Sequence, residues 1–595
     1  MKKLFIGLIL CFLLIFVGCK NTNRTDYNIY AVRSEAHLKK LINTDNEWRY
    51  DYAKGGSDNA VEEPGDIPEG EESKKSHSET NVQVEGVDEG DIVKTDGNRI
   101  YIASYQTFKV IEVEGDKLEL IFEEKIDNDN YYFELYITER YAIVIGSSYS
   151  YSTMYWWPSK QSITIDIYDI RTSKIQLEKE IEYSGFYNTS RLIDDRLYVI
   201  SNYKVDKNKV SRPVFRDDSN ETMPNYSEIK YVGGLVNNCY TIFSTIVLEE
   251  EIIANHDTFL GFWGGEIYFN KESIYLASPD YYNSKTDITR YSINKQTDHI
   301  ELEGCIGVSG FLVNQFFMDE YNGYFRVVTT NNDWGTNRII NETNHLYIYE
   351  ITNESRRGMK LVGSITKGIG KPGETVMSVR FNGDEVSVVT FRQIDPLYII
   401  DLSEPSEPRI VGELEIPGYS SYQHHWDNNT IIGIGFNVEN NMSNGIKVSL
   451  FDKTDPTDLK EVATLIFQGY AEATYNHKAI LIDKAHNIFG FSVNEYELNE
   501  YWYYQPVYYL IQVDLTSEEP LKVVAKINAM PEIVDSNNNY YHFEQILRMI
   551  NIEDYYYAIS HSHVRVYTFE EGKIKLVNQL QIQDYKEEAN WYYYR

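Results

Sequence analysis

Cysteine is scarce in this chain. Four occur among 595 residues, at Cys11, Cys19, Cys239 and Cys305. No CxxC pair and no Cys/His spacing typical of a zinc site is present, which excludes a structural zinc site of the usual kind. If Cys11 is removed with a leader and Cys19 is modified, only two remain. Two cysteines cannot make a disulfide framework, so they either pair with each other or stay as buried thiols.

Local catalytic motifs are also missing. The sequence has no GxSxG elbow, no HExxH helix and no P-loop. Nucleophilic hydrolysis, zinc proteolysis and nucleotide chemistry therefore have no local support.

Positive charge is in short supply. Lys and Arg number 56 against 90 Asp and Glu, which gives a formal net charge of −34, and loss of a leader containing Lys2 and Lys3 makes the chain more negative still. Such a chain repels phosphates, so nucleic acid is excluded as a partner. The simplest interpretation is solubility outside the cell; weak binding of divalent cations is the alternative.

Only one long apolar run occurs, at residues 4–17 after Lys2 and Lys3. As a helix it would cover ~21 Å of a ~30 Å hydrocarbon core, so a secretory signal is favoured over a transmembrane helix. Residues 16–19 (FVGC) resemble a lipoprotein cleavage box, although Phe16 replaces the usual leucine. We therefore expect a lipoprotein signal peptide at 1–18 and a lipid anchor on Cys19 that holds the exported protein at the outer face of the bacterial cell membrane. An ordinary signal with an incidental cysteine is the alternative.

Residues 19–79 are predicted to be a lipid-anchored tether. Apolar spacing predicts a short helix near 34–43 with Ser34 as its N-cap, and this helix could pack on the main domain. Residues 51–79 are rich in Gly, Ser, Glu, Asp and Pro and nearly free of aliphatic residues, which is typical of a flexible spacer.

From Asp91 onward, short alternating strands follow one another, such as 99–104 and 109–113, separated by turn residues. A later strand of each unit often ends in an acid and a turn, as at 165–170 and 397–402. The spacing of these units averages about 57 residues. We count nine unit starts, near Asp91, Phe133, Arg191, Trp263, Val313, Val376, Gln423, Thr474 and Ile546.

This period predicts an all-β fold: one β-propeller domain over 80–595 with about eight (seven to nine) four-stranded blades. Fewer blades than units would result if the first and last units merged on closure. A β-solenoid has shorter and more regular coils, and a tandem of β-sandwiches would need linkers that residues 91–595 do not show.

Residues 80–97 (TNVQVEGVDEGDIVKTDG) look like the opening signature of a family of secreted bacterial and archaeal proteins with a C-terminal β-propeller domain, distantly related to WD-repeat propellers. Further segments resemble the same family, namely 401–408, 412–419, 433–435, 452–456 and 476–481. Residues 423–426 (QHHW) depart from its pattern. The resemblance implies a propeller outside the cell but no particular reaction.

A carboxylate cluster at Glu85, Asp88, Glu89 and Asp91, with Asp96 nearby, is dense enough to suggest calcium, which prefers oxygen ligands. The spacing does not fit an EF-hand loop. A charged turn that introduces an edge strand is the simpler interpretation, so no cofactor is expected, with Ca²⁺ possible. His424 and His425 are interpreted as sheet or loop residues rather than metal ligands.

Aromatic clusters in two expected loops are candidates for ligand contact, since exposed aromatic area often marks recognition. These residues are Tyr155, Trp156, Trp157, Trp502 and Tyr503.

Taken together, the sequence predicts a surface-anchored, non-enzymatic propeller that binds or scaffolds an extracellular protein, peptide or glycan. A hydrolase or lyase of extracellular polymers, using carboxylates at the propeller funnel, is the alternative.

Overall fold

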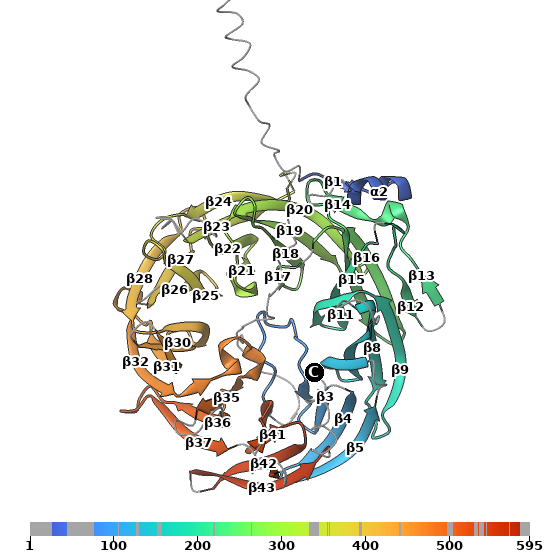
Figure 1. Cartoon of the computed structure of the whole chain (residues 1–595). Helices are drawn as coiled ribbons and strands as arrows, with labels where there is room; N and C mark the ends of the chain where they lie inside the picture. Colours follow the sequence, from blue (N-terminus) through green and yellow to red (C-terminus); the bar gives the residue numbers. More distant parts are fainter. Residues whose placement is uncertain are drawn as a thin grey trace, which may run out of the picture.

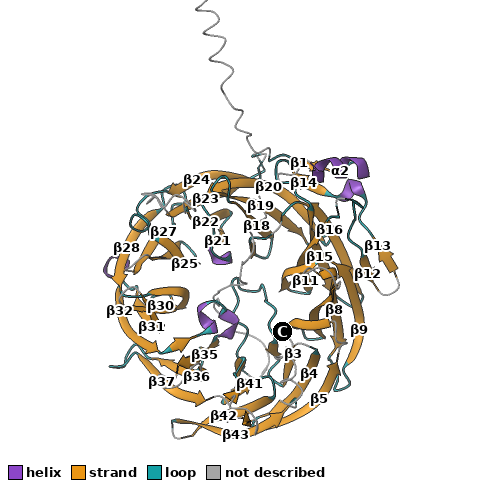
Figure 2. Cartoon of the chain, in the orientation of Figure 1, coloured by secondary structure: helices purple, strands orange, loops and turns teal. Residues whose placement is uncertain are grey.

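A computed structural model describes residues 27–43 and 76–583, with gaps at 105, 126–129, 152–157, 207, 218–219, 263, 332–343, 354, 356, 392–394, 440–441, 497–503, 529–532, 535–540, 543 and 571. Its strands form nine twisted sheets arranged in a ring around a central channel, as Figure 1 shows. Strands dominate and helices are few (Figure 2). The predicted all-β propeller is therefore confirmed, and the nine sheets lie within the predicted range.

The first three blades follow one another from the start of the propeller. Blade 1 is β2 (Val93–Thr95), β3 (Arg99–Ser104), β4 (Thr107–Glu114) and β5 (Lys117–Lys125). Blade 2 is β6 (Asn130–Ile137), β7 (Tyr141–Tyr151), β8 (Pro158–Asp169) and β9 (Gln176–Ser184), extended outward by β12 (Phe215–Asp217) and β13 (Asn220–Thr222). Blade 3 is β10 (Phe186–Ile193), β11 (Arg196–Lys204), β15 (Cys239–Leu248) and β16 (Ile252–Leu260), extended by β14 (Lys230–Val232) and β1 (Ile29–Ala31).

The next three blades have four strands each. Blade 4 is β17 (Glu266–Phe269), β18 (Ser273–Asp280), β19 (Lys285–Asn294) and β20 (His299–Ser309). Blade 5 is β21 (Met318–Tyr321), β22 (Tyr324–Thr330), β23 (Asn344–Ile351) and β24 (Met359–Ile365). Blade 6 is β25 (Thr375–Asn382), β26 (Glu385–Phe391), β27 (Asp395–Asp401) and β28 (Arg409–Ile416).

The last three blades complete the ring. Blade 7 is β29 (Tyr419–Asp427), β30 (Thr430–Glu439), β31 (Met442–Asp452) and β32 (Lys460–Phe467). Blade 8 is β33 (Gly469–Tyr470), β34 (Leu481–Asp483), β35 (Ile488–Tyr496), β36 (Tyr504–Val513) and β37 (Leu521–Asn528). Blade 9 is β40 (Arg548–Ile552), β41 (Tyr555–Ile559), β42 (His563–Glu570) and β43 (Lys573–Gln581), and a separate pair joins β38 (Ile533–Val534) to β39 (Tyr541–His542).

The helical elements are short. They are α2 (Glu35–Asn43) and the single 3₁₀ turns η2 (Tyr226–Glu228), η3 (Gln315–Phe317), η4 (Pro456–Asp458), η5 (Glu472–Thr474) and η6 (His477–Ala479). The helix predicted near 34–43 is α2, and the Ser34 hydroxyl accepts a hydrogen bond from the His37 backbone N–H at 3.2 Å, as an N-cap does. None of the described helices is both long and apolar enough to cross a bilayer.

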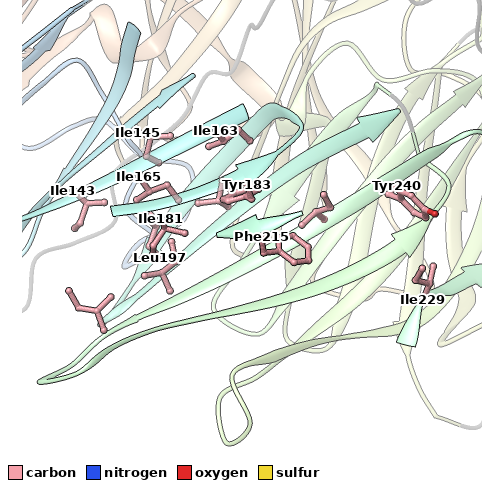
Figure 3. Packing of buried hydrophobic residues seen from close by; sticks show 14 of the residues in the cluster. Ile143, Ile145, Ile163, Ile165, Ile181, Tyr183, Leu197, Phe215, Ile229 and Tyr240 are labelled. Carbon is pink, nitrogen blue, oxygen red and sulfur yellow. The ribbon is translucent and has the colours of Figure 1, made fainter. Parts of the chain in front are cut away.

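The hydrophobic core lies between neighbouring blades. Alternating strand residues put isoleucine, valine and tyrosine side chains on both faces of each sheet, where they interdigitate with the next sheet. Figure 3 shows this between blades 2 and 3, where Ile165 and Ile181 lie near Leu197; within blade 2, Tyr183 lies near Phe215. Cys239 and Cys305 are buried free thiols in this part of the ring, and burial raises the pKa of both.

A recurring bulge shapes the fourth strand of most blades. Register shifts between the third and fourth strands occur in eight blades, for example at Ile348/Tyr349 and Ile399/Ile400. At the bulge in blade 5, a Cβ on Gly363 would collide with the backbone carbonyl of Pro405 in the next blade. Glycine is therefore required there because the next blade packs against the bare backbone.

Buried tyrosines account for part of the tyrosine and acid excess. Their hydroxyls donate to carboxylates on inner strands or turns: Tyr101 to Asp96 at 2.8 Å, and Tyr556 to Asp483 of blade 8 at 2.7 Å. Burial raises the pKa of both hydroxyls, so they stay protonated donors. The first pair therefore braces blade 1 internally, and the second ties blade 9 to blade 8.

The ring closes without exchanging strands. In the described residues, blade 1 is built wholly from 93–125 and blade 9 wholly from 548–581, so first and last units do not merge. The two blades share one apolar cluster, and the Tyr557 hydroxyl of blade 9 donates to the Gly115 carbonyl of blade 1 at 2.6 Å. Nine units therefore give nine blades.

Candidate functional site: the plugged central channel

Residues 77–92, hereafter the plug segment, cross the central channel before the chain enters blade 1. In Figure 1 the segment is the blue trace at the middle of the ring. It contains most of the signature on which the family resemblance rests. Its contacts reach the inner ends of most blades, so the described chain itself occupies the channel that an open propeller would offer to a ligand.

The plug segment first extends blade 9 inward. His77 forms an antiparallel bridge with Ile552 of β40. The Ser78 N–H donates to the Asn551 carbonyl at 2.9 Å, while the Ser78 hydroxyl accepts from the Asn551 N–H at 2.8 Å. This pairing covers the inner edge of a strand whose backbone groups would otherwise lack partners.

The segment then spans the channel to blades 7, 8 and 5. The Asn81 amide donates to the Tyr422 hydroxyl of β29 at 3.1 Å and to the His477 carbonyl at 3.5 Å. The Gln83 amide donates to the Gln315 carbonyl in η3 at 3.4 Å. Side-chain amides therefore fix the middle of the plug segment to three blades.

A tight turn reverses the plug segment. The Val87 N–H donates to the Val84 carbonyl at 2.9 Å, and Gly86 has a positive φ of 71° that a residue with a Cβ adopts with difficulty. Val87 is buried in the cluster that contains Phe262 and Phe269. The turn is thus anchored by apolar burial as well as by its backbone.

The returning limb pairs with blades 3 and 2. Asp88 and Leu192 of β10 exchange two backbone hydrogen bonds at 2.7 and 2.9 Å, and Asp91 bridges Leu135 of β6. The chain then becomes β2, the inner strand of blade 1. Residues 77–92 therefore pair with the last blade at one end and with blades 3 and 2 at the other.

Glu89 is the most deeply buried charge of the plug segment, with a side chain 1% exposed. It lies 2.6 Å from the Arg191 guanidinium, which is itself 5% exposed, and 3.4 Å from the His477 ring. Arg191 also donates to the Gln315 side chain at 3.1 Å. A buried charge needs such a partner, because leaving it alone out of water is very costly.

Asp91 is held by an arginine from the far end of the sequence. Arg548 Nε lies 3.0 Å from both carboxylate oxygens of Asp91, and a second nitrogen lies 3.5 Å from Glu472. Burial alone would lower the pKa of Arg548, but the charges of Asp91 and Glu472 outweigh it and raise the pKa. Arg548 therefore stays charged, and the pair ties the plug segment to blade 9.

Two lysines also lie against the plug segment. Lys94 lies 2.6 Å from Asp88, and Lys478 donates to the Gly90 carbonyl at 2.6 Å. Burial works to lower the pKa of Lys478, but Glu134, Glu89 and Asp91 nearby raise it. An acidic segment is therefore surrounded by cations from the inner ends of the blades, although the chain as a whole is strongly acidic.

A cavity of about 780 Å³ lies beside the plug segment. Plug residues such as Thr80 and Val82 form one wall, while Ile137 of blade 2, Asp194 of blade 3 and Leu481 of blade 8 contribute to the others. Its size lies in the range of small-ligand pockets. The described residues that line it mix acids and bases and include no Phe, Tyr or Trp.

The structure separates the four carboxylates predicted as a possible calcium site. Glu85 is exposed at the turn, whereas Asp88, Glu89 and Asp91 face Lys94, Arg191 and Arg548. In the described residues no group of three or more His, Cys, Asp or Glu side chains is arranged to hold a metal ion. Calcium binding here stays a prediction.

The other predicted site residues fall outside the described part of the chain. These are Cys19 and the aromatic residues Tyr155, Trp156, Trp157, Trp502 and Tyr503. His424 and His425 lie within β29, as expected for sheet residues. Burial lowers the pKa of both rings well below the usual value, so both are neutral.

Sequence reasoning missed the cations of the channel. Arg191 marked the start of the third unit and Lys478 lay in a segment that carried the family resemblance, but neither suggested contact with the acidic signature. Arg191 and Lys94 lie near the ends of inner strands, but Lys478 lies in η6 and Arg548 begins β40, so no common spacing could have found all four.

Comparison with known proteins supports the architecture. A family model described as "Beta propeller domain" matches residues 77–572. An uncharacterised protein of Archaeoglobus fulgidus is 28% identical over 87% of each chain, and one of Methanocaldococcus jannaschii is 25% identical over 96% of each.

Matches to solved structures have low TM-scores. Citrobacter koseri AztD matches with a TM-score of 0.34 at 11% identity, covering 70% of this chain and 94% of that one. A functionally unknown protein from Desulfotomaculum acetoxidans matches with a TM-score of 0.30 at 10% identity, covering 57% and 95%.

Proposed function

Because this chain belongs to the β-propeller domain family, we propose that it acts as a non-enzymatic binding scaffold outside the cell. In this proposal, a lipid on Cys19 holds it at the outer face of the cell membrane. Its ligand is a peptide segment of an extracellular protein, bound in the cavity beside the plug segment.

The observation that carries the proposal is the cavity itself. It joins the plug segment to blades 1, 2, 3, 8 and 9, so a ligand there would contact several parts of the rigid ring at once. Its wall offers Glu79, Asp96 and Asp194 together with Lys94 and Arg548. Peptides carry charges of both signs and backbone donors and acceptors, which suit such a wall.

A glycan fits the same wall less well. Sugars commonly stack on apolar aromatic faces, and the described lining residues supply none. The aromatic residues proposed for glycan contact from the sequence lie outside the described residues, so that alternative is kept in the experiment below.

Catalysis by paired carboxylates is not favoured at this site. A glycoside hydrolase needs one acid that is protonated and one that is free to act as base or nucleophile. Here Glu89 and Asp91 each lie within 3.0 Å of an arginine, so both carboxylates are engaged in structural ion pairs.

The test is a thermal-shift screen of the chain from residue 20 against pooled short peptides, cell-wall oligosaccharides and Ca²⁺. A peptide at 100 times its dissociation constant stabilises the folded state by ~2.7 kcal/mol. With an unfolding entropy of ~2.1 cal/mol/K per residue over roughly 500 residues, this stabilisation should raise the melting temperature by about 2–3 °C.

A matched pair of variants locates the binding. Val82→Trp fills the cavity and should abolish the shift, whereas Val313→Trp, at a position 53% exposed and away from the cavity, should retain it. A shift with oligosaccharides alone, or equal shifts in both variants, would overturn the peptide site. A calcium shift lost in Asp88→Asn would support the metal prediction. Mass spectrometry of the Cys19 peptide from isolated membranes tests the anchor separately.

A further inference from the structure

Residues 27–43 are an integral part of the propeller rim. The Tyr27 hydroxyl donates to Asp287 at 2.6 Å and accepts from Lys285 at 3.0 Å, and the Arg357 guanidinium lies over the Tyr27 ring, 5.1 Å from its centre. These contacts hold the first described residue against blades 4 and 5.

The rest of this stretch is attached to blade 3. β1 pairs antiparallel with β14, and the Val32 N–H donates to the Ile229 carbonyl at 2.8 Å. Leu38 and Ile42 of α2 are completely buried in the apolar cluster shared by blades 2 and 3. Figure 1 shows α2 and β1 on the outside of the ring.

This rim differs in charge from the rest of the molecule. Residues 20–43 contain five Lys and Arg and two Asp and Glu, within a chain whose formal charge is −34. Arg33, Lys39, Lys40 and Lys230 are exposed here. Beside them Ile29 and Tyr30 are 37% and 39% exposed, an amphipathic combination typical of surfaces that meet lipid headgroups.

The length of chain before Tyr27 limits how far this rim can move from an anchor. Eight residue steps separate Cys19 from Tyr27. Fully extended, they reach at most about 29 Å. The reach of an anchor at Cys19 is therefore set by residues 20–26 and not by the spacer at 51–79.

We propose that the rim surface formed by Ile29, Tyr30, Arg33, Lys39, Lys40 and Lys230 docks on the anionic headgroups of the membrane, so that the propeller stands with the rim of blades 3 and 4 toward the bilayer. This inference rests on the lipid anchor of the proposed function. The short reach from Cys19 favours lipid over an acidic protein as the occupant.

The experiment couples the chain from Cys19 onward to vesicles through a maleimide lipid, which the buried Cys239 and Cys305 leave unaffected. Vesicles contain either phosphatidylglycerol in phosphatidylcholine or phosphatidylcholine alone. A water-soluble reagent then acetylates surface lysines, and mass spectrometry reads each position.

On phosphatidylglycerol, acetylation of Lys39, Lys40 and Lys230 should slow at least about fivefold, the factor expected for one basic residue at an anionic surface. The effect should weaken on phosphatidylcholine and in high salt. Lys573 and Lys575 on β43, across the ring in Figure 1, should react at an unchanged rate.

A pair of charge-reversal variants supplies the control. Lys39→Glu with Lys40→Glu should remove the protection of Lys230, whereas Lys573→Glu with Lys575→Glu should preserve it, and melting temperatures establish that both are folded. Equal acetylation of the two rims on both vesicles would overturn the docking surface. The protein is coupled to the vesicles chemically, so the acetylation result does not depend on whether Cys19 is lipidated in the cell. Lipidation is tested separately by mass spectrometry of the Cys19 peptide from isolated membranes.

Discussion

Removing the negative charge of Glu89 should lower the stability of the folded protein. Glu89→Gln keeps the size of the side chain but leaves the Arg191 guanidinium buried without its carboxylate at 2.6 Å. Breaking one partner of a buried ion pair costs about 3–5 kcal/mol. At ~2.1 cal/mol/K per residue for roughly 500 residues, unfolding entropy is near 1 kcal/mol/K, so the melting temperature should fall by about 3–5 °C.

A double-mutant cycle separates the pair from its surroundings. Arg191→Met alone should destabilise similarly, because it isolates the buried Glu89, while the double variant should recover most of the loss. Scanning calorimetry measures all four proteins. Glu114→Gln, which breaks an exposed pair with Lys117 at 2.7 Å, is the matched control and should shift melting by less than about 1 °C. Additive single-variant losses, or a loss no larger than the control, would refute the proposed coupling.

Three further changes test the packing of the ring. Burial raises the pKa of Asp166 to about 6, so the folded state binds a proton more readily than the unfolded chain does. The free energy of unfolding therefore falls as pH rises through about 4–6. In calorimetry, Asp166→Asn should melt about 3 °C higher than wild type at pH 7 and lose this pH dependence. Burial lowers the pKa of His256 to about 4, so stability is lost as pH falls from about 6.5 to 4. In denaturant titrations, His256→Phe should lose ~2–3 kcal/mol less unfolding free energy than wild type over this pH range. An unchanged pH profile would contradict this. Gly363→Ala should destabilise the protein by ~2 kcal/mol or more, because its Cβ would collide with the Pro405 carbonyl. In the control Gly572→Ala the new Cβ meets no atom, so the loss of stability should come only from the strain of its positive φ.

The β-propeller architecture could be predicted from the sequence because it depends on local residue patterns. Period-two alternation and turn residues recur in each blade, and the nine predicted unit starts fall at or near the inner strands of the nine blades. The number of blades could not be derived from counting alone, because the sequence does not show whether the first and last units merge. Tyr557 and Gly115 meet across the closure only in the folded ring.

The contacts of the plug segment in the central channel could not be predicted from local patterns. Asp91 and Arg548 are 457 residues apart, and no spacing rule links them. The acidic signature was interpreted as a charged turn or a metal cluster, since local composition cannot show that isolated cations from four blades converge on it. Its partners, Arg191, Lys94 and Lys478 among them, depend on the ring being closed.

The plug segment is a fixed part of the channel and forms one wall of the cavity beside it. Hydrogen exchange of peptides covering residues 77–92 in the wild-type protein tests it most directly. We expect the hydrogen-bonded N–H groups of Ser78, Val87 and Asp88 to be protected as well as those of the inner blade strands. Exchange as fast as that of exposed turns would show that the segment does not close the channel and would contradict the account.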